Sequence, residues 1–251
     1  MRKVFWDNPY QQSLETKVSQ VDGNVIVFSE TIGFSECGGQ ESDVVTVNDI
    51  RAISSHMDKC APFLIYYTFP EGHGFVPGEN VIMKIDWLRR NRLMRLHFTC
   101  ELILVLMNRL FNETPEGVEL KPEEIDTVIK KRGAHIAETG ARVDFECDVN
   151  IAVYFPKLLE EYNKIISADL PIEKGFLDEF NQIRFWRLPN IATVPCGGTH
   201  VHSTGEVGLI ELKRDRANKG VERIRISLKD YHPQPPSCEY HASPPPARDS
   251  R

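Results

Sequence analysis

The chain has 251 residues, of which 41% are hydrophobic and 26% charged, proportions ordinary for a globular protein with a proper core. The formal net charge of −6 at pH 7 argues against a protein that binds nucleic acid over its whole surface, although a local basic patch is compatible with it. The most apolar run, residues 102–107, is too short to cross a bilayer, and the first residues lack a signal-peptide pattern. No membrane role is expected, and six isolated cysteines favour a cytoplasmic location with reduced thiols.

The first 85 residues have the pattern of short strands separated by turns. Residues 24–34 and 63–69 are rich in β-favouring side chains, a Gly/Pro loop follows at 70–80, and a further run closes near Ile85. Short strands without a long helical pattern predict an antiparallel β-barrel over residues 1–85.

A long helix is predicted to begin after Asp86. Residues 86–111 contain no Gly or Pro, carry apolar residues at helical spacing, and start with a suitable N-cap. Two further helices and four further strand segments are predicted, the helices at 121–131 and 156–170 and the strands at 141–149, 183–195, 207–215 and 221–228. Helices followed by strands without regular alternation predict an α+β domain over 86–230. Residues 231–251, rich in Pro and Ser, are predicted to be a disordered tail.

Two pairs of metal-capable residues stand out. His97 and Glu101 are four apart on the long helix, so they share one face at the edge of an apolar stripe, where a carboxylate needs a partner. Cys196 and His200 flank Gly-Gly-Thr, and a thiolate with an imidazole favours zinc. Each pair alone has a plain alternative, a surface contact for the first and a tight turn for the second. Together they make one tetrahedral ligand set, provided that the fold brings them together.

Four segments in the chain resemble, in order, the alanyl-tRNA editing family: the free-standing AlaX proteins and the editing domain of alanyl-tRNA synthetase, related to that of threonyl-tRNA synthetase. They are "TIGFSECGGQESD", "IDWLRRNRLMRLHFTCELI", "VPCGGTHVHSTGEVGLIEL" and "NKGVERIRI". "CGGTH" followed by "TGEVG" is the most specific of them. The glycine-rich first segment in a chain of this length resembles the medium-length AlaX type. The resemblance implies an N-terminal β-barrel followed by the second additional domain, the editing domain.

The resemblance also implies a function, the hydrolysis in trans of wrongly charged tRNA(Ala). The substrates would be seryl-tRNA(Ala) and, second, glycyl-tRNA(Ala), because a pocket built for alanine cannot exclude glycine and excludes serine only weakly. The partner would be the acceptor end of tRNA(Ala), with no DNA, and the protein would be a monomer or a homodimer. No ATP would be needed by this chain.

The family's metal ligands carry over as His97, Cys196 and His200, where the residue types match. Glu101 stands where the family has a second helix histidine. A carboxylate can bind zinc, Zn²⁺ being the expected cofactor, but it lowers the charge of the site, makes bound water less acidic, and shifts preference toward other divalent metals such as Mn²⁺ or Fe²⁺. Two alternatives stay open: Glu101 acts as a base rather than a ligand, or the site is inactive.

Three polar residues are candidates for positioning the substrate or the attacking water, namely Thr31, Gln40 and Thr199. By resemblance Thr31 would read the hydroxyl of a seryl group, and an ordinary strand threonine is its alternative. A metal in the site would polarise the ester carbonyl or deliver hydroxide.

Contact with RNA is expected to be local. Basic residues crowd the turns before His97 and recur after "TGEVG", giving as candidates Arg89, Arg90, Arg92 and Arg95, then Lys213, Arg214, Arg216, Lys219, Arg223 and Arg225. Such runs are usually solvated faces. Because these flank the predicted site on both sides, they favour contacts with acceptor-stem phosphates. The other histidines, His56, His73, His135 and His202, are expected to be bystanders.

Two other functions remain open. One is a non-catalytic tRNA-binding module in which Glu101 has abolished the metal site. The other is a metal hydrolase of the same fold that acts on a different small ester or amide.

Overall fold

A computed structural model describes residues 1–57, 63–127 and 129–230 of the chain. The predicted tail, residues 231–251, and two of the cysteines, Cys60 and Cys238, lie outside the described residues. Within that part of the chain, no helix is both long and apolar enough to cross a membrane.

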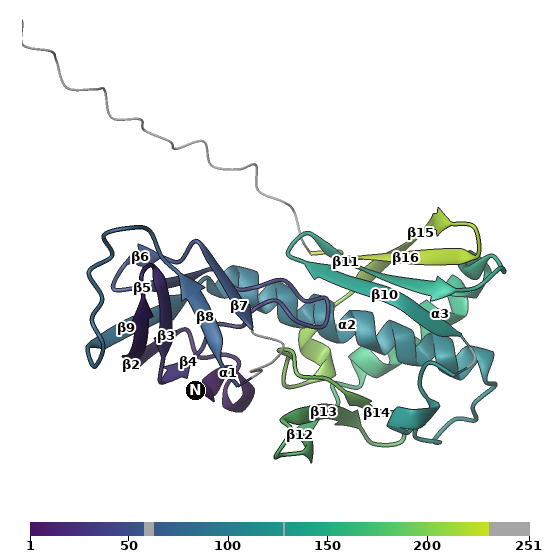
Figure 1. The fold of residues 1–251 in the computed structure, drawn as a ribbon. Coiled ribbons are helices and arrows are strands. Elements are labelled where there is room, and N and C mark those ends of the chain that lie inside the picture. Colours follow the sequence, from purple (N-terminus) through teal and green to yellow (C-terminus); the bar gives the residue numbers. More distant parts are fainter. Residues whose placement is uncertain (58–62, 128, 231–251) are drawn as a thin grey trace, which may run out of the picture.

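The N-terminal half is a curled antiparallel sheet (Figure 1). Seven strands pair in the order β6-β5-β9-β2-β3-β8-β7: β2 (Ser13–Asp22), β3 (Val25–Phe28), β5 (Val45–Val47), β6 (Ile50–Arg51), β7 (Ser54–Met57), β8 (Ile65–Thr68) and β9 (Asn80–Ile85). Two short strands, β1 (Arg2–Lys3) and β4 (Glu30–Thr31), pair in parallel, and α1 (Val4–Asp7) follows β1. Strict alternation along β9 puts Val81, Met83 and Ile85 into the core of this half.

The predicted closed barrel is not confirmed. The strands β6 and β7 stand at the two ends of the sheet order, and no pairing joins them among the described residues. The sheet therefore curls without a complete ring of hydrogen bonds. Short strands and turn signals specify strand length and spacing, but they do not specify whether the last strand meets the first.

A single long helix, α2 (Trp87–Phe111), runs from the N-terminal sheet into the second half of the molecule (Figure 1). Asp86 caps it as predicted, because its carboxylate accepts the backbone N–H of Arg89 at 3.1 Å. Most of its side chains from Leu93 to Asn108 are buried, so the helix forms the centre of the C-terminal core.

Two antiparallel sheets lie on either side of α2 (Figure 1). The larger has the order β10-β11-β16-β15, with β10 (Lys130–Ala137), β11 (Gly140–Glu146), β15 (Ile210–Asn218) and β16 (Val221–Leu228). The smaller has the order β12-β13-β14, with β12 (Glu173–Asp178), β13 (Ile183–Leu188) and β14 (Ala192–Pro195). Another helix, α3 (Phe155–Ser167), packs against α2. Sheets and helices are thus segregated, which confirms the α+β class.

One predicted helix is wrong. The described residues of the range 121–131 include one 3₁₀ turn, η1 (Pro122–Glu124), and the start of β10 at Lys130. Asp126 has φ 71°, a left-handed conformation that a helix interior does not accept, and its N–H donates to the side chain of Asn108 on α2. Two other 3₁₀ turns, η2 (Ile151–Tyr154) and η3 (Thr204–Glu206), complete the described elements.

Candidate metal centre

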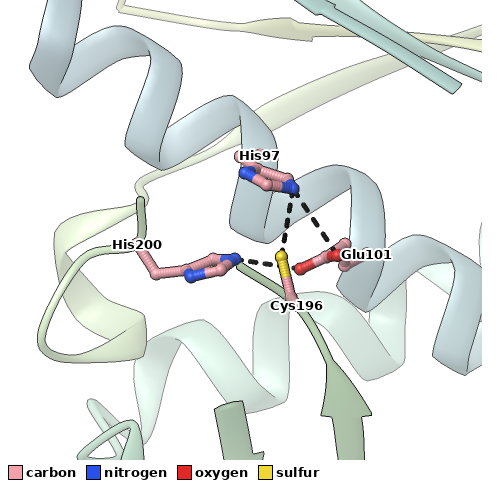
Figure 2. Close-up of side chains that lie close together, drawn as sticks. All are labelled: His97, Glu101, Cys196 and His200. Atoms are coloured by element: carbon pink, nitrogen blue, oxygen red, sulfur yellow. Dashed lines mark hydrogen bonds and ion pairs between the residues drawn. The ribbon is translucent and has the colours of Figure 1, made fainter. Parts of the chain in front are cut away.

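Four metal-capable side chains from two distant segments meet in one cluster (Figure 2). His97 and Glu101 come from one face of α2, and Cys196 and His200 come from the loop that follows β14. Each offers one ligand atom, and the four atoms all lie within 4.8 Å of one another. The predicted convergence of the two pairs is therefore present in the fold.

The contacts within the cluster are direct. The Nε2 atom of His97 lies 3.5 Å from Sγ of Cys196 and 3.5 Å from Oε1 of Glu101. The Nε2 atom of His200 lies 2.9 Å from Oε2 of Glu101. Zinc bonds of about 2.0–2.3 Å place tetrahedral ligands about 3–4 Å apart, so this donor set fits a small divalent ion.

Gln40 holds His97 from the opposite side. Its Oε1 accepts the backbone N–H of Thr199 at 3.2 Å, and its Nε2 donates to the Thr199 hydroxyl at 2.9 Å, which fixes the orientation of the amide. The same Oε1 lies 2.6 Å from Nδ1 of His97. A carbonyl oxygen only accepts, so Nδ1 carries the proton and Nε2 turns its lone pair toward the cluster.

The second glycine of "CGGTH" is required by this close packing. A Cβ atom at Gly198 would lie 2.1 Å from Cε1 of His97 and 2.9 Å from Oε1 of Gln40. The backbone N–H of Gly198 also points at Sγ of Cys196, at 3.4 Å, and helps to stabilise a thiolate. Gly198 is therefore part of the site, because it lets the loop approach the helix.

Burial determines the protonation of the cluster. It lowers the pKa of His200 to about 4, against the hydrogen bond to Glu101, so the imidazole is neutral at pH 7. Burial, with the Glu101 charge, raises the pKa of the Cys196 thiol well above its usual value. Burial would also raise the pKa of Glu101, but His97 and His200 outweigh it and hold that pKa well below its usual range. Around the buried Glu101 carboxylate stand the neutral His200 imidazole and the Cys196 thiol, an environment that a cation would complete.

Trp186 is a contact of the site that the sequence did not indicate. Its indole N–H donates to Oε2 of Glu101 at 2.7 Å, so that oxygen is held by both Trp186 and His200. The ring also packs edge-on against Phe98 of α2, with centroids 5.1 Å apart. Tryptophan is a common residue in strands, so its presence in the sequence does not indicate a site. Its partner Glu101 is 85 residues away along the chain.

The three predicted positioning residues lie in different places. Gln40 and Thr199 contact the cluster or its support, as described. Thr31 is buried in the N-terminal core, where its hydroxyl lies 2.6 Å from that of Tyr67 and bonds to the N–H of Gly33 at 3.0 Å. None of its contacts among the described residues is with the cluster, and its substrate role stays a prediction.

The structure corrects the expectation for Arg90. Its side chain is fully buried and bonds to the carboxylate of Asp43 and to the carbonyl oxygens of Pro9 and Ile32. A guanidinium enclosed in this way joins α2 to the N-terminal half and does not reach a phosphate. Its neighbours Arg89 and Arg92 are paired with Glu138, and Arg89 also with Glu41.

The basic residues after "TGEVG" lie mainly on the outer face of the larger sheet. Along β16, Ile224 and Ile226 are buried against the core, so Arg223 and Arg225 face the other way, and Lys213 is the cross-strand partner of Arg225. That face turns away from α2, whereas the cluster lies toward the smaller sheet. Arg214, Arg223 and Arg225 are paired with Glu222, Asp144 and Asp215.

The predicted bystander histidines lie outside the cluster. His202 stacks on Tyr10, with ring centroids 4.4 Å apart, and His56 stacks on Tyr66. His73 bonds to the carbonyl of Gly23 and the N–H of Phe75, and His135 lies 3.4 Å from a carboxylate oxygen of Glu41.

Comparison with known proteins places this site in a family context. The profile described as "Threonyl and Alanyl tRNA synthetase second additional domain" matches residues 183–225. The alanyl-tRNA editing protein AlaX-M of Pyrococcus horikoshii is 24% identical over 91% of this chain and 98% of its own length. AlaX-L of the same organism is 26% identical over 90% of this chain and 58% of its own length. The alanine–tRNA ligase of Methanococcus aeolicus is 25% identical over 89% of this chain, which spans about a quarter of that ligase.

The segment that carries Cys196 and His200 is therefore similar to the synthetase second additional domain. More narrowly, the comparisons confirm the predicted resemblance to the AlaX family of alanyl-tRNA editing proteins.

Proposed function

We propose that this protein is a trans-editing hydrolase that removes the amino acid from mischarged tRNA(Ala). Seryl-tRNA(Ala) is the main substrate of this proposal and glycyl-tRNA(Ala) the second. The observation that carries it is the convergence of His97, Glu101, Cys196 and His200 in a chain that resembles alanyl-tRNA editing proteins over most of its length.

The four residues would hold one divalent ion, with Zn²⁺ the first expectation. A thiolate and two imidazoles favour zinc, whereas the carboxylate of Glu101 is also a suitable ligand for Mn²⁺ or Fe²⁺. When bound, the ion would act as a Lewis acid on the ester carbonyl and acidify water. Gln40 would keep the Nε2 lone pair of His97 aimed at the ion, and the N–H of Gly198 would stabilise the Cys196 thiolate.

Thr199 and Gln40 support the reaction from beside the ion. The Thr199 hydroxyl accepts from Gln40, so its own proton is free to donate to a water or a substrate oxygen. Thr31 is kept as a candidate for contact with a seryl hydroxyl.

The chain would divide between residues 85 and 86 into an N-terminal domain, 1–85, and an editing domain, 86–230. Two separate hydrophobic clusters support this division. In contacts with tRNA, Lys213 and Lys219 are the first candidates, because both are exposed and neither has an ion-pair partner among the described residues. Arg89, Arg92, Arg214 and Arg223 would have to exchange a carboxylate for a phosphate.

The test is deacylation of purified seryl-tRNA(Ala) by the full chain. We expect turnover that Cys196→Ala abolishes and that Cys37→Ala, at an exposed free thiol, leaves unchanged. Turnover absent with every divalent metal while tRNA still binds would contradict the proposal and favour a non-catalytic binding module. Hydrolysis of small esters irrespective of tRNA would favour a hydrolase with another substrate.

The role of Glu101 is tested by measuring the zinc affinity of its variants. If Glu101 is a ligand, Glu101→Ala lowers zinc affinity at least tenfold, because even the loss of a residue that only supports a ligand has an effect of this size. Glu101→His retains or tightens zinc and lowers the pH at which the rate reaches its plateau, because the site gains positive charge. The measurement is competition with a chromophoric chelator. Unchanged affinity in Glu101→Ala would show that this carboxylate is not a ligand.

A further inference from the structure

A small cavity borders the cluster, and its walls are cationic and aromatic. Its lining joins two residues of the cluster to side chains of α1, β12 and β13: Cys196, His200, Trp6, Lys174 and Arg184. The amino group of Lys174 donates to the backbone carbonyl of His200 at 3.0 Å. The indole N–H of Trp6 donates to the carbonyl of Gly197 at 2.8 Å.

The hairpin of β12 and β13 presents one face to this cavity. Phe176 and Arg184 are direct cross-strand partners, and Lys174 lies two residues before Phe176, so the three side chains share a face. The guanidinium carbon of Arg184 lies 4.7 Å from the ring centroid of Phe176 and 5.3 Å from that of Trp6. Phe176 keeps 38% of its surface exposed, so one side of this stack is open to solvent.

The two cations of this face have no carboxylate at ion-pair distance among the described residues. Arg184 is only 8% exposed, and its one hydrogen bond there is to the backbone carbonyl of Trp6, at 3.3 Å. Lys174 uses one of its three N–H groups on His200. Most other arginines of the molecule are paired with acids. Two enclosed positive charges with no carboxylate at contact distance favour an anionic ligand at this place.

We propose that this face is a binding site for the single-stranded 3′ end of an RNA. A phosphate of the terminal nucleotide lies between Lys174 and Arg184, and a base stacks on the exposed side of Phe176. Sequence-independent recognition of single strands combines these two elements, a cationic groove and aromatic faces. Arginine suits it because its planar group binds phosphate and stacks on rings at once.

The cationic side chains of this face lie next to the cluster. The 3′ end of a charged tRNA carries the ester, and the small cavity lined by Lys174 and Arg184 is also lined by Cys196 and His200. A terminal nucleotide held at Phe176 would therefore place its aminoacyl group next to the cluster. That identification of the RNA rests on the proposed function, whereas the site for a single-stranded end rests on the face itself.

The experiment compares two RNA hairpins that differ only in a four-nucleotide single-stranded 3′ extension. Binding of each to the full protein is measured by fluorescence anisotropy at pH 7. We expect the extended hairpin to bind more tightly, and we expect Phe176→Ala and Lys174→Met each to lower that preference by about tenfold, the effect of one lost stack or phosphate contact. Phe176→Tyr, which keeps an aromatic face, should retain the preference.

Two matched variants control for nonspecific effects. Ile183→Ala removes an equally exposed apolar side chain, 46%, from the same hairpin next to Arg184 but on the other face. Lys213→Met removes a lysine from the outer face of the larger sheet. Neither variant should change the preference for the extended hairpin. Lys213→Met is expected to weaken the binding of both hairpins equally. Equal binding of the two hairpins by the unaltered protein, or equal weakening of both by Phe176→Ala, would overturn the proposal.

Failure of this inference is distinguishable from failure of the proposed function. If the protein deacylates seryl-tRNA(Ala) and Phe176→Ala leaves KM unchanged, the function stands and the binding site is wrong. If no deacylation occurs but the preference for the extended hairpin is present and is lost in Phe176→Ala, the binding site stands alone.

Discussion

At the scale of single residues, the site depends on one amide. Gln40 lies in the first glycine-rich motif. It bonds to Thr199 in the second, "CGGTH", and to His97 on α2. From the sequence, Gln40 is a candidate for positioning the substrate or the attacking water. Its geometry gives it a different task, that of setting the tautomer of a ligand. Such a role depends on His97, 57 residues away, and on Thr199, 159 residues away, and has no local signal.

Removing this amide should loosen the metal. We expect Gln40→Ala to lower zinc affinity about 10–100-fold, the usual effect of losing a hydrogen bond to a ligating histidine. Gln40→Glu should restore part of the affinity, since a carboxylate also accepts from Nδ1. Titration against a chromophoric chelator measures both. A Gln40→Ala protein with unaltered affinity and normal folding would show that His97 needs no such support.

At the scale of elements, predictions succeeded where one pattern was long and uninterrupted. The helix over 86–111 was predicted nearly in full, because 25 residues without Gly or Pro and with a capping aspartate leave no competing structure. Residues 121–131 failed for the opposite reason. The run is short, and the contact of Asp126 with Asn108 on α2 decides its conformation. Likewise, the sequence counted basic residues beside the site, whereas the pairing of β15 with β16 turns Lys213 and Arg223 away from it.

The cap of α2 offers a measurement at this scale. Asp86→Ala should lower the free energy of unfolding by about 1 kcal/mol, because the N–H of Arg89 loses its acceptor. Asp86→Asn should cost less, since an amide oxygen also caps. Urea unfolding of the three proteins gives the comparison. Equal stability of Asp86→Ala and the unaltered protein would mean that solvent caps this helix end equally well.

At the scale of the whole molecule, a buried ion pair joins the two halves. Arg90 on α2 bonds to Asp43, and the same guanidinium reaches backbone carbonyls at Pro9 and Ile32. His97 and Glu101 therefore stand on a helix whose first turn is fixed to the N-terminal half. The sequence suggested two domains and did not suggest this link, because an arginine in a basic run looks solvated.

Breaking that pair should cost much more than breaking a surface pair. Arg90→Met leaves the Asp43 carboxylate buried without its partner, and we expect a loss of about 3–5 kcal/mol in unfolding free energy. The double variant Arg90→Met, Asp43→Asn should recover part of it. Arg92→Met, which removes a more exposed arginine of the same helix, should cost less than about 1 kcal/mol. A small loss in Arg90→Met would show that the halves do not depend on this link.

Acid should destabilise the metal-free protein in two stages. Burial lowers the pKa of His200 to about 4 from 6.5, so the unfolded chain binds the extra proton first and stability falls as the pH drops from about 6.5 to 4. Hydrogen bonds from Arg187 hold the pKa of Glu119 at about 2, below its usual 4.5, and this contribution is lost from about pH 4.5 downward.

Urea midpoints measured with chelator at pH 7.5, 5.5 and 4 test this order. His200→Gln should flatten the first stage and leave the second unchanged. A stability that does not change between pH 6.5 and 4 would contradict a buried neutral His200.

The separation of the ligands along the chain also bears on the making of the protein. His97 and Cys196 are 99 residues apart, and Gln40 comes earlier still. During synthesis the helix with its first two donors emerges long before the "CGGTH" loop, so a growing chain presents only half of a coordination shell. The fourth donor arrives after the last strand of the smaller sheet. Under the proposed function, metal capture and ester hydrolysis would therefore wait until the "CGGTH" loop has been synthesised, and a growing chain that still lacks this loop would leave the charged tRNAs around it intact.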